Sequence, residues 1–151
     1  MEIERKYLID EIPFDLKDYP CKVIEQGYLN TDPVVRVRCS NDKYILTYKG
    51  SGLMVREEYN LPLNEDAYRH LIQKADGIII SKKRYLIPLT GRLTIELDIF
   101  EGDLAPLKLA EVEFETKEEA ESFLPPKWFG KDVTFSSDYH NSTLSRVGLP
   151  T

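Results

Sequence analysis

The chain has 151 residues, of which 42% are hydrophobic and 11% aromatic, so it is long enough and apolar enough to bury a core instead of staying disordered. Its formal net charge of −6 gives no general attraction to nucleic acid or to an anionic membrane, so any bound anion must be held by a local basic cluster. The two cysteines, Cys21 and Cys39, match neither a metal spacing nor a disulfide framework and favour a reducing compartment.

The sequence shows no targeting segment and no boundary of a second domain. The second residue is already charged, which argues against a signal peptide, and apolar runs such as 77–80 are far too short to cross a membrane. No repeat, low-complexity tract or linker divides the sequence. We therefore expect one domain over residues 1–151, a cytoplasmic location, and neither nucleic acid nor membrane as a partner. A homodimer is left open.

Alternation of polar and apolar residues dominates the chain and predicts eight strands. Gly, Pro, Asn, Asp and Ser residues punctuate these segments, and several of the connections are short enough for antiparallel hairpins. In chain order, the predicted strands cover residues 2–9, 22–30, 34–39, 43–49, 54–61, 78–88, 92–100 and 109–115.

Three segments break this alternation and predict helices. Residues 64–75 begin with Asn64 as N-cap and place acidic residues in the first turn. Residues 116–124 begin with Thr116 in a capping box, and residues 137–146 predict a last short helix. Eight strands with a few helices indicate an α+β fold, and in particular a closed eight-stranded antiparallel barrel with a charged lumen and helices packed outside.

Most predicted strands carry charge on one face. Glu2, Glu4 and Lys6 share a face of the first strand, and Arg36 and Arg38 share a face of the third. The basic residues on these faces are Lys6, Arg36, Arg38, Lys49, Arg56, Lys82, Arg84 and Arg92. The acidic residues are Glu2, Glu4, Glu58, Glu96, Asp98, Glu111, Glu113 and Glu115.

A charged strand face is usually the solvated side of a sheet. Two features favour an inward orientation here. The faces consist almost entirely of charged residues, and Arg outnumbers Lys five to three, which suits oxyanions held by the planar guanidinium. Eight strands can close around one small ligand, and charges inside must pair, stay wet or enclose a charged ligand. A polyanion with a divalent cation would satisfy both sets.

The motif Glu2-x-Glu4-x-Lys6 resembles the N-terminal signature of the CYTH superfamily, the triphosphate tunnel metalloenzymes, in its compact bacterial form. The resemblance runs in order along the whole chain, without a large insertion. The further matching segments are Gln26-Gly27-Tyr28-Leu29, Arg36-x-Arg38, Thr47-x-Lys49-Gly50, Arg56-x-Glu58, Lys82-x-Arg84-Tyr85, Glu96-Leu97-Asp98, Phe100-Glu101-Gly102-Asp103-Leu104 and Ala110-Glu111-Val112-Glu113. One departure is Asp138, where compact members often carry a basic residue before the tyrosine, so we do not expect the C-terminal segment to cap the tunnel with positive charge.

The resemblance implies an eight-stranded tunnel that binds the triphosphate of its substrate and requires Mg²⁺ or Mn²⁺. The metal ligands it implies are Glu2, Glu4, Glu111 and Glu113. The phosphate-binding residues it implies are Lys6, Arg36, Arg38, Lys49, Arg56, Lys82 and Arg84. Glu58 is a candidate for a second metal or for orienting water, and Tyr28 with Lys82 is a candidate for activating water or protonating the leaving group. Tyr28 is equally well explained as an aromatic residue of the wall.

The function predicted in this way is hydrolysis of inorganic tripolyphosphate or a nucleoside triphosphate by a divalent-metal-dependent triphosphatase. Two alternatives are a class IV-type adenylate cyclase and a non-catalytic polyphosphate-binding module. No extra segment is available for a base pocket, and a mere anion binder gains little from so many carboxylates. His70 and His140 have no partner at ligand spacing and are expected to be solvated or to cap helices.

Overall fold

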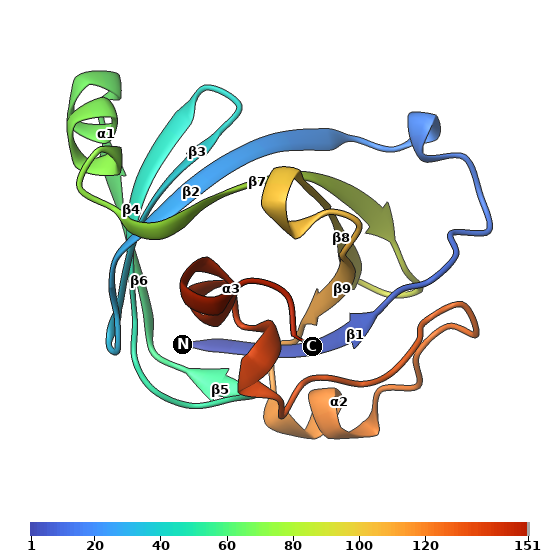
Figure 1. Ribbon diagram of the computed structural model, residues 1–151. Coiled ribbons are helices and arrows are strands. Elements are labelled where there is room, and N and C mark those ends of the chain that lie inside the picture. Colours follow the sequence, from blue (N-terminus) through green and yellow to red (C-terminus); the bar gives the residue numbers. More distant parts are fainter. Residues whose placement is uncertain (151) are drawn as a thin grey trace.

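The computed structural model describes residues 1–150. Over this range, nine antiparallel strands form one sheet that curls into a nearly closed barrel, with the first two α-helices outside the wall and the third across one end (Figure 1). The strands are β1 (Glu2–Leu8), β2 (Cys21–Thr31), β3 (Val34–Ser40), β4 (Lys43–Lys49), β5 (Val55–Arg56), β6 (Glu58–Leu63), β7 (Asp76–Pro88), β8 (Thr94–Glu101) and β9 (Lys108–Glu113). The helices are α1 (Glu65–Ile72), α2 (Lys117–Ser122) and α3 (Asn141–Val147), with 3₁₀ turns at Leu16–Asp18, Gly102–Leu104 and Ser137–Tyr139.

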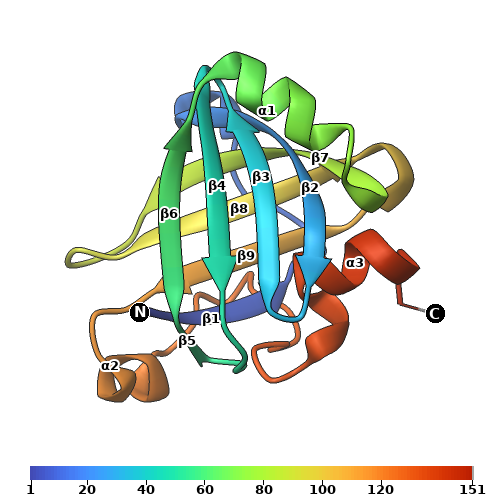
Figure 2. The same cartoon turned by 90° about the vertical axis from the view of Figure 1, so that its left-hand side faces the viewer.

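The sheet order is β5-β1-β9-β8-β7-β2-β3-β4-β6. Figure 2 shows β2, β3, β4 and β6 side by side at the front, with β7, β8 and β9 crossing behind them. The predicted antiparallel barrel is confirmed, but the number of strands was wrong. The segment expected as one strand over 54–61 divides at Glu57, because its two parts pair with opposite ends of the sheet. Val55–Arg56 pairs with β1, whereas Glu58–Leu63 pairs with β4.

The helix starts follow the capping residues. The Asn64 side chain accepts a 2.7 Å hydrogen bond from the backbone N–H of Ala67, and Thr116 Oγ1 accepts one of 3.1 Å from the N–H of Glu119. Both contacts satisfy N–H groups that have no partner within the helix. α1 and α2 end earlier than predicted, and the last predicted helix begins as a 3₁₀ turn before α3. No helix within residues 1–150 combines the length and the apolar character needed to cross a membrane.

The apolar core has two parts, one outside the barrel wall and one inside it. The outer cluster includes Leu97, Val112 and Phe114, and the aromatic side chains of Trp128 and Phe129 pack against it. These strand residues alternate with the charged ones, so they lie on the outer face of the sheet.

The inner cluster fills one end of the barrel beneath α3. Leu144 of α3 is fully buried there with Ile80, Phe100 and Leu109, which share the lumen parity of the charged residues. In Figure 1, α3 lies across the opening of the ring. Gly77 permits this close approach: its φ is +69°, and a Cβ atom there would lie 2.1 Å from the carbonyl oxygen of Ser145.

Candidate active site

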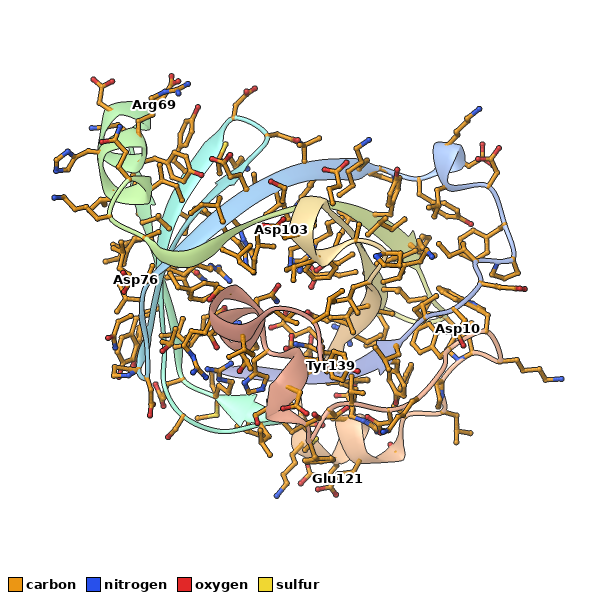
Figure 3. All side chains as sticks on the ribbon, viewed as in Figure 1. Asp10, Arg69, Asp76, Asp103, Glu121 and Tyr139 are labelled. Carbon is orange, nitrogen blue, oxygen red and sulfur yellow. The ribbon has the colours of Figure 1, made fainter. Side chains whose placement is uncertain are left out.

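The barrel encloses a polar cavity of about 240 Å³ between the apolar end and the opposite opening. Side chains converge on this centre from the surrounding strands, whereas Arg69 of α1 and Glu121 of α2 point away from it (Figure 3). The lining residues are Glu2, Glu4, Lys6, Tyr28, Val34, Arg36, Arg38, Ile45, Lys49, Arg56, Glu58, Asn60, Arg84, Glu96, Glu111, Glu113, His140, Asn141 and Ser142. The structure thus brings together every residue expected in the site except Lys82.

One side of the cavity is an acidic wall, formed by Glu2 and Glu4 on β1, Glu58 on β6, and Glu111 and Glu113 on β9. The antiparallel register places Glu4 opposite Glu113. Two lysines partly balance this wall. Lys6 Nζ lies 3.6 Å from a Glu111 carboxylate oxygen, and Lys49 Nζ lies 3.0 Å from Glu2 and 3.4 Å from Glu58. Five carboxylates therefore face two ammonium groups.

The imbalance appears in the pKa values of the acidic wall. Burial raises the pKa of Glu4 well above its usual range, and the neighbouring Glu111 and Glu2 raise it further. Burial also raises the pKa of Glu2, although Lys49 opposes the shift. Burial acts in the same direction on Glu111, but Lys6 and Arg84 outweigh it and hold the pKa of Glu111 well below its ordinary value. Negative charge is therefore unevenly stabilised along this wall.

The facing basic wall consists of Arg36 and Arg38 on β3 and Arg84 on β7. Behind it, Asp98 of β8 is fully buried and accepts two hydrogen bonds from Arg84, of 2.7 and 2.8 Å. Lys82 donates a third bond of 2.6 Å to the same carboxylate. Burial disfavours the Asp98 carboxylate, but Arg84 and Lys82 lower its pKa below the ordinary value. Asp98 thus fixes the direction of the Arg84 guanidinium.

Lys82 does not line the cavity. Its side chain is fully buried, and its ammonium contacts Asp98 and, at 3.4 Å, the side-chain oxygen of Asn141 in α3. Burial lowers the pKa of Lys82 to about 7, although Asp98 opposes this shift. In this arrangement Lys82 reaches the lumen only through Asp98 and Arg84.

Uncharged residues hold the cationic side chains in place. Arg38 Nε donates a 2.7 Å hydrogen bond to Gln26, whose amide donates one of 3.2 Å to the Tyr28 hydroxyl oxygen. The Tyr28 O–H is therefore free to point away from Gln26. Arg36 donates a 2.9 Å bond to Thr47, while its Nε is buried and lacks a partner within the described chain. Such an orphaned donor on a cavity wall is suited to an anionic ligand.

A second chain of polar contacts links the two walls. Thr47 Oγ1 donates a 2.6 Å hydrogen bond to Asn60, and the Asn60 amide donates one of 3.2 Å to Glu58. The sequence prediction did not include Gln26, Thr47 or Asn60 in the site. Strand parity was the signal that could have found them, because Thr47 shares a face with Lys49 and Asn60 shares one with Glu58.

The C-terminal segment also contributes to the cavity, which the sequence prediction missed. His140, Asn141 and Ser142 line it. His140 was expected to be solvated or to cap a helix; it does occupy the N-cap position of α3, but its side chain makes no capping bond. Burial lowers its pKa to about 4, assisted by nearby Lys6 and other cations, so the imidazole is neutral at pH 7. The carbonyl of Tyr139, labelled in Figure 3, accepts a 3.2 Å bond from Lys6.

The acidic wall suits a divalent cation in donor type and charge. Carboxylate oxygens are the hard ligands that Mg²⁺ and Mn²⁺ prefer. The raised pKa values of Glu2 and Glu4 reflect, besides burial, repulsion that a cation would relieve. Within residues 1–150, no three His, Cys, Asp or Glu side chains converge closely enough to hold a metal ion as they stand. The residues thus fit the ion chemically, without a preformed coordination sphere.

Comparison with known proteins agrees with this geometry. The profile of the CYTH domain matches residues 1–147. The chain belongs to the CYTH domain family. The resemblance inferred from the Glu2-x-Glu4-x-Lys6 motif is therefore confirmed.

Two relatives that align with this CYTH domain over at least 92% of their length carry the name inorganic triphosphatase. The protein from Nitrosomonas europaea is 37% identical over 148 residues, which cover 95% of this chain and 96% of the relative. The protein from Acetivibrio thermocellus is 34% identical over 151 residues, covering 95% and 92%. A crystal structure of the inorganic triphosphatase NE1496 matches with a TM-score of 0.71 and 34% identity, over 96% of this chain and 94% of that one.

Proposed function

We propose that this CYTH domain is a divalent-metal-dependent triphosphatase that hydrolyses inorganic tripolyphosphate within the barrel. The observation that carries the proposal is the enclosed cavity, in which an acidic wall suited to a cation faces a basic wall suited to phosphate. The two relatives named above, which are similar over nearly their whole length, support inorganic triphosphate as the substrate.

The basic wall would bind and orient the phosphate chain. Arg36 and Arg38 present guanidinium groups from β3, and Arg84 does so from β7. Lys6, Lys49 and Arg56 also line the cavity and would complete the phosphate-binding set. We propose that Lys82 acts through Asp98 and Arg84, because its ammonium is already engaged behind the wall.

Mg²⁺ or Mn²⁺, held by Glu2, Glu4, Glu111 and Glu113, would neutralise phosphate charge when bound. The protein's own residues would align a water molecule with the terminal phosphorus. In this proposal Glu58 would orient that water and accept its proton. The hydrogen bond with Glu2 and the charge of Lys49 lower the pKa of Glu58 despite partial burial, which keeps its carboxylate ionised.

The reaction forms a bond between the water oxygen and the terminal phosphorus and breaks the bond from that phosphorus to the bridging oxygen. The electron pair leaves with pyrophosphate, and the terminal group becomes orthophosphate. The Tyr28 hydroxyl accepts its hydrogen bond from Gln26, so its own O–H would be available to donate one to the departing oxygen. Most of the rate enhancement would come from positioning and charge stabilisation.

The deciding experiment measures phosphate release from tripolyphosphate, ATP, GTP and thiamine triphosphate, with Mg²⁺ or Mn²⁺ and with a chelator. We expect metal-dependent release that is fastest with tripolyphosphate. Conversion of ATP to cyclic AMP and pyrophosphate would instead identify a cyclase. Tripolyphosphate at about a hundred times its Kd should stabilise the fold by roughly 2.7 kcal/mol. Stabilisation by tripolyphosphate without hydrolysis would indicate a non-catalytic polyphosphate-binding module instead of an enzyme.

We also propose that the enzyme works in the cytoplasm. Cys21 and Cys39 are both free, as is usual in a reducing compartment. Cell fractionation followed by detection of the protein would check this location.

A further inference from the structure

A second cavity of about 270 Å³ adjoins the first one beside α3; we call it the lateral cavity. It shares Val34, Arg56, His140 and Ser142 with the cavity in the barrel, so the two lie side by side. The inner apolar cluster and α3 cover this end of the barrel directly. The lateral cavity lies beside α3, along the β2–β3 turn and the loop at 50–52, where a long ligand leaving the barrel would run.

Two guanidinium groups dominate the chemistry of the lateral cavity. Arg56 is anchored through a 3.1 Å bond from its Nε to the carbonyl of Gly50, and it makes no other hydrogen bond or ion pair within the described chain. Arg146, in the last turn of α3, makes none within residues 1–150. Asp32 is the single carboxylate in the lining, so the cavity carries net positive charge in a chain of net charge −6. Hydroxyl groups come from Thr31, Ser51, Ser137, Ser142 and Thr143.

We propose that the lateral cavity is a subsite for linear polyphosphates longer than tripolyphosphate, and that it binds the phosphoryl groups beyond the third. The inference rests on the proposed binding of three phosphoryl groups inside the barrel. Arg56 lines both cavities and would hold the junction, while Arg146 lines the lateral cavity only. A volume of about 270 Å³ is several times the roughly 30 Å³ taken by a water molecule, so further phosphoryl groups have room.

The lining favours phosphate over a nucleoside. A nucleobase is usually held by aromatic or apolar surfaces against which it can stack. Here Val34 is the single branched aliphatic side chain in the lining and His140 the single ring, among residues 1–150. Hydroxyl and guanidinium donors match phosphate oxygens instead.

The test compares tripolyphosphate, linear tetrapolyphosphate and ATP as substrates of the full chain and of Arg146→Ala. We expect the kcat/KM ratio of tetrapolyphosphate to tripolyphosphate to fall about tenfold in the variant, the scale of one lost charge-assisted hydrogen bond. Melting shifts with each polyphosphate in a chelator give a readout that does not need turnover. The shift from tetrapolyphosphate should shrink more than that from tripolyphosphate.

Arg69→Ala is the matched control, since Arg69 also lies in the last turn of a helix but points away from the barrel (Figure 3). It should leave the ratio unchanged. An equal loss with both polyphosphates in Arg146→Ala would overturn the subsite, and so would a loss with ATP as large as that with tetrapolyphosphate. Failure of the wild type to hydrolyse any substrate would refute the proposed function, while the melting shifts would still decide whether the subsite exists.

Discussion

The two walls of the cavity balance their buried charge in different ways. Behind the basic wall, Lys82 shares with Arg84 the fully buried carboxylate of Asp98, at distances of 2.6 to 2.8 Å. In the acidic wall, the Lys6 contact to Glu111 is longer, at 3.6 Å, and the pKa of Glu4 is raised. At Arg84 the basic wall thus carries its own counter-ion, although burial and the neighbouring Arg36 and Arg84 lower the pKa of Arg38 to about 9. The acidic wall lacks part of its counter-charge.

We propose that this difference suits the two walls to different tasks. A guanidinium held by its own counter-ion, as Arg84 is by Asp98, would keep its direction whether or not ligand is present, as electrostatic preorganisation requires. A wall with excess negative charge responds to its surroundings, because either protons or a cation can relieve it. The basic wall would therefore position phosphate, and the acidic wall would make occupancy depend on metal and pH.

The largest expected effect comes from removing the internal counter-ion. Asp98→Asn keeps the volume but leaves Lys82 buried without a paired carboxylate and Arg84 with the Glu96 contact at 3.2 Å, so we expect a loss of about 3–5 kcal/mol in the free energy of unfolding. Urea denaturation measures it. Glu65→Gln, which breaks an exposed pair with Arg69, should cost no more than about 1 kcal/mol. Similar losses in both variants would mean that the basic wall does not depend on Asp98.

Neutralising the acidic wall should reduce activity without unfolding the protein. Glu2→Gln and Glu4→Gln should each lower phosphate release by about 100- to 1,000-fold, because an amide lacks the charge that attracts the cation. Glu57→Gln is the control, since Glu57 is exposed and bonded to the hydroxyl of Tyr59. Three active variants would show that the acidic wall does not bind the metal.

Within the basic wall, Arg36→Ala and Arg38→Ala should each lower turnover by about one to three orders of magnitude while the melting temperature is largely kept. Steady-state assays at limiting tripolyphosphate are the measurement. Lys83→Ala, on the outer face of β7 beside the Arg84 position, should retain activity. Full activity of either arginine variant would exclude that side chain from substrate binding.

The smallest effect concerns pH. The folded-state pKa of Glu4 lies above its unfolded value of 4.5, so its contribution to stability is complete below that value and is lost as pH rises through the folded pKa. Glu4→Gln does not titrate. The variant should therefore gain stability relative to wild type on going from about pH 4 to about pH 7. Urea denaturation at both pH values tests the sign, and a gain confined to the lower pH would contradict it.

Strand parity is the part of the structure that the sequence predicted well. Alternation is a local property, so the residues Arg36 and Arg38 could be assigned to one face before any strand was paired. The expectation that these two side chains face the lumen rested on the charged faces that recur on most of the predicted strands. The roles of the residues are a further step, which rests on the experiments above.

Other features depended on contacts between distant segments. Lys82 shares the parity of Arg84, yet the position of Asp98 on the neighbouring strand holds its ammonium behind the wall. His140 entered the cavity lining because α3 packs on the inner cluster through Leu144. The strand divides at Glu57 because β5 lies at one edge of the sheet and β6 at the other. No local sequence pattern marks that point.

The open seam between the two edges of the sheet, β5 and β6, also indicates which strand of the barrel is the least stable. Beyond Glu57, β6 pairs with β4 on one side and has no strand on the other, within the part of the chain described. Pro62 lies on this free edge, where its missing N–H discourages pairing with another molecule. Neither apolar cluster includes a residue of β6 among residues 1–150. Detaching β6 therefore costs less than separating any strand of the core, and its amide hydrogens should exchange with solvent before those of β8 and β9.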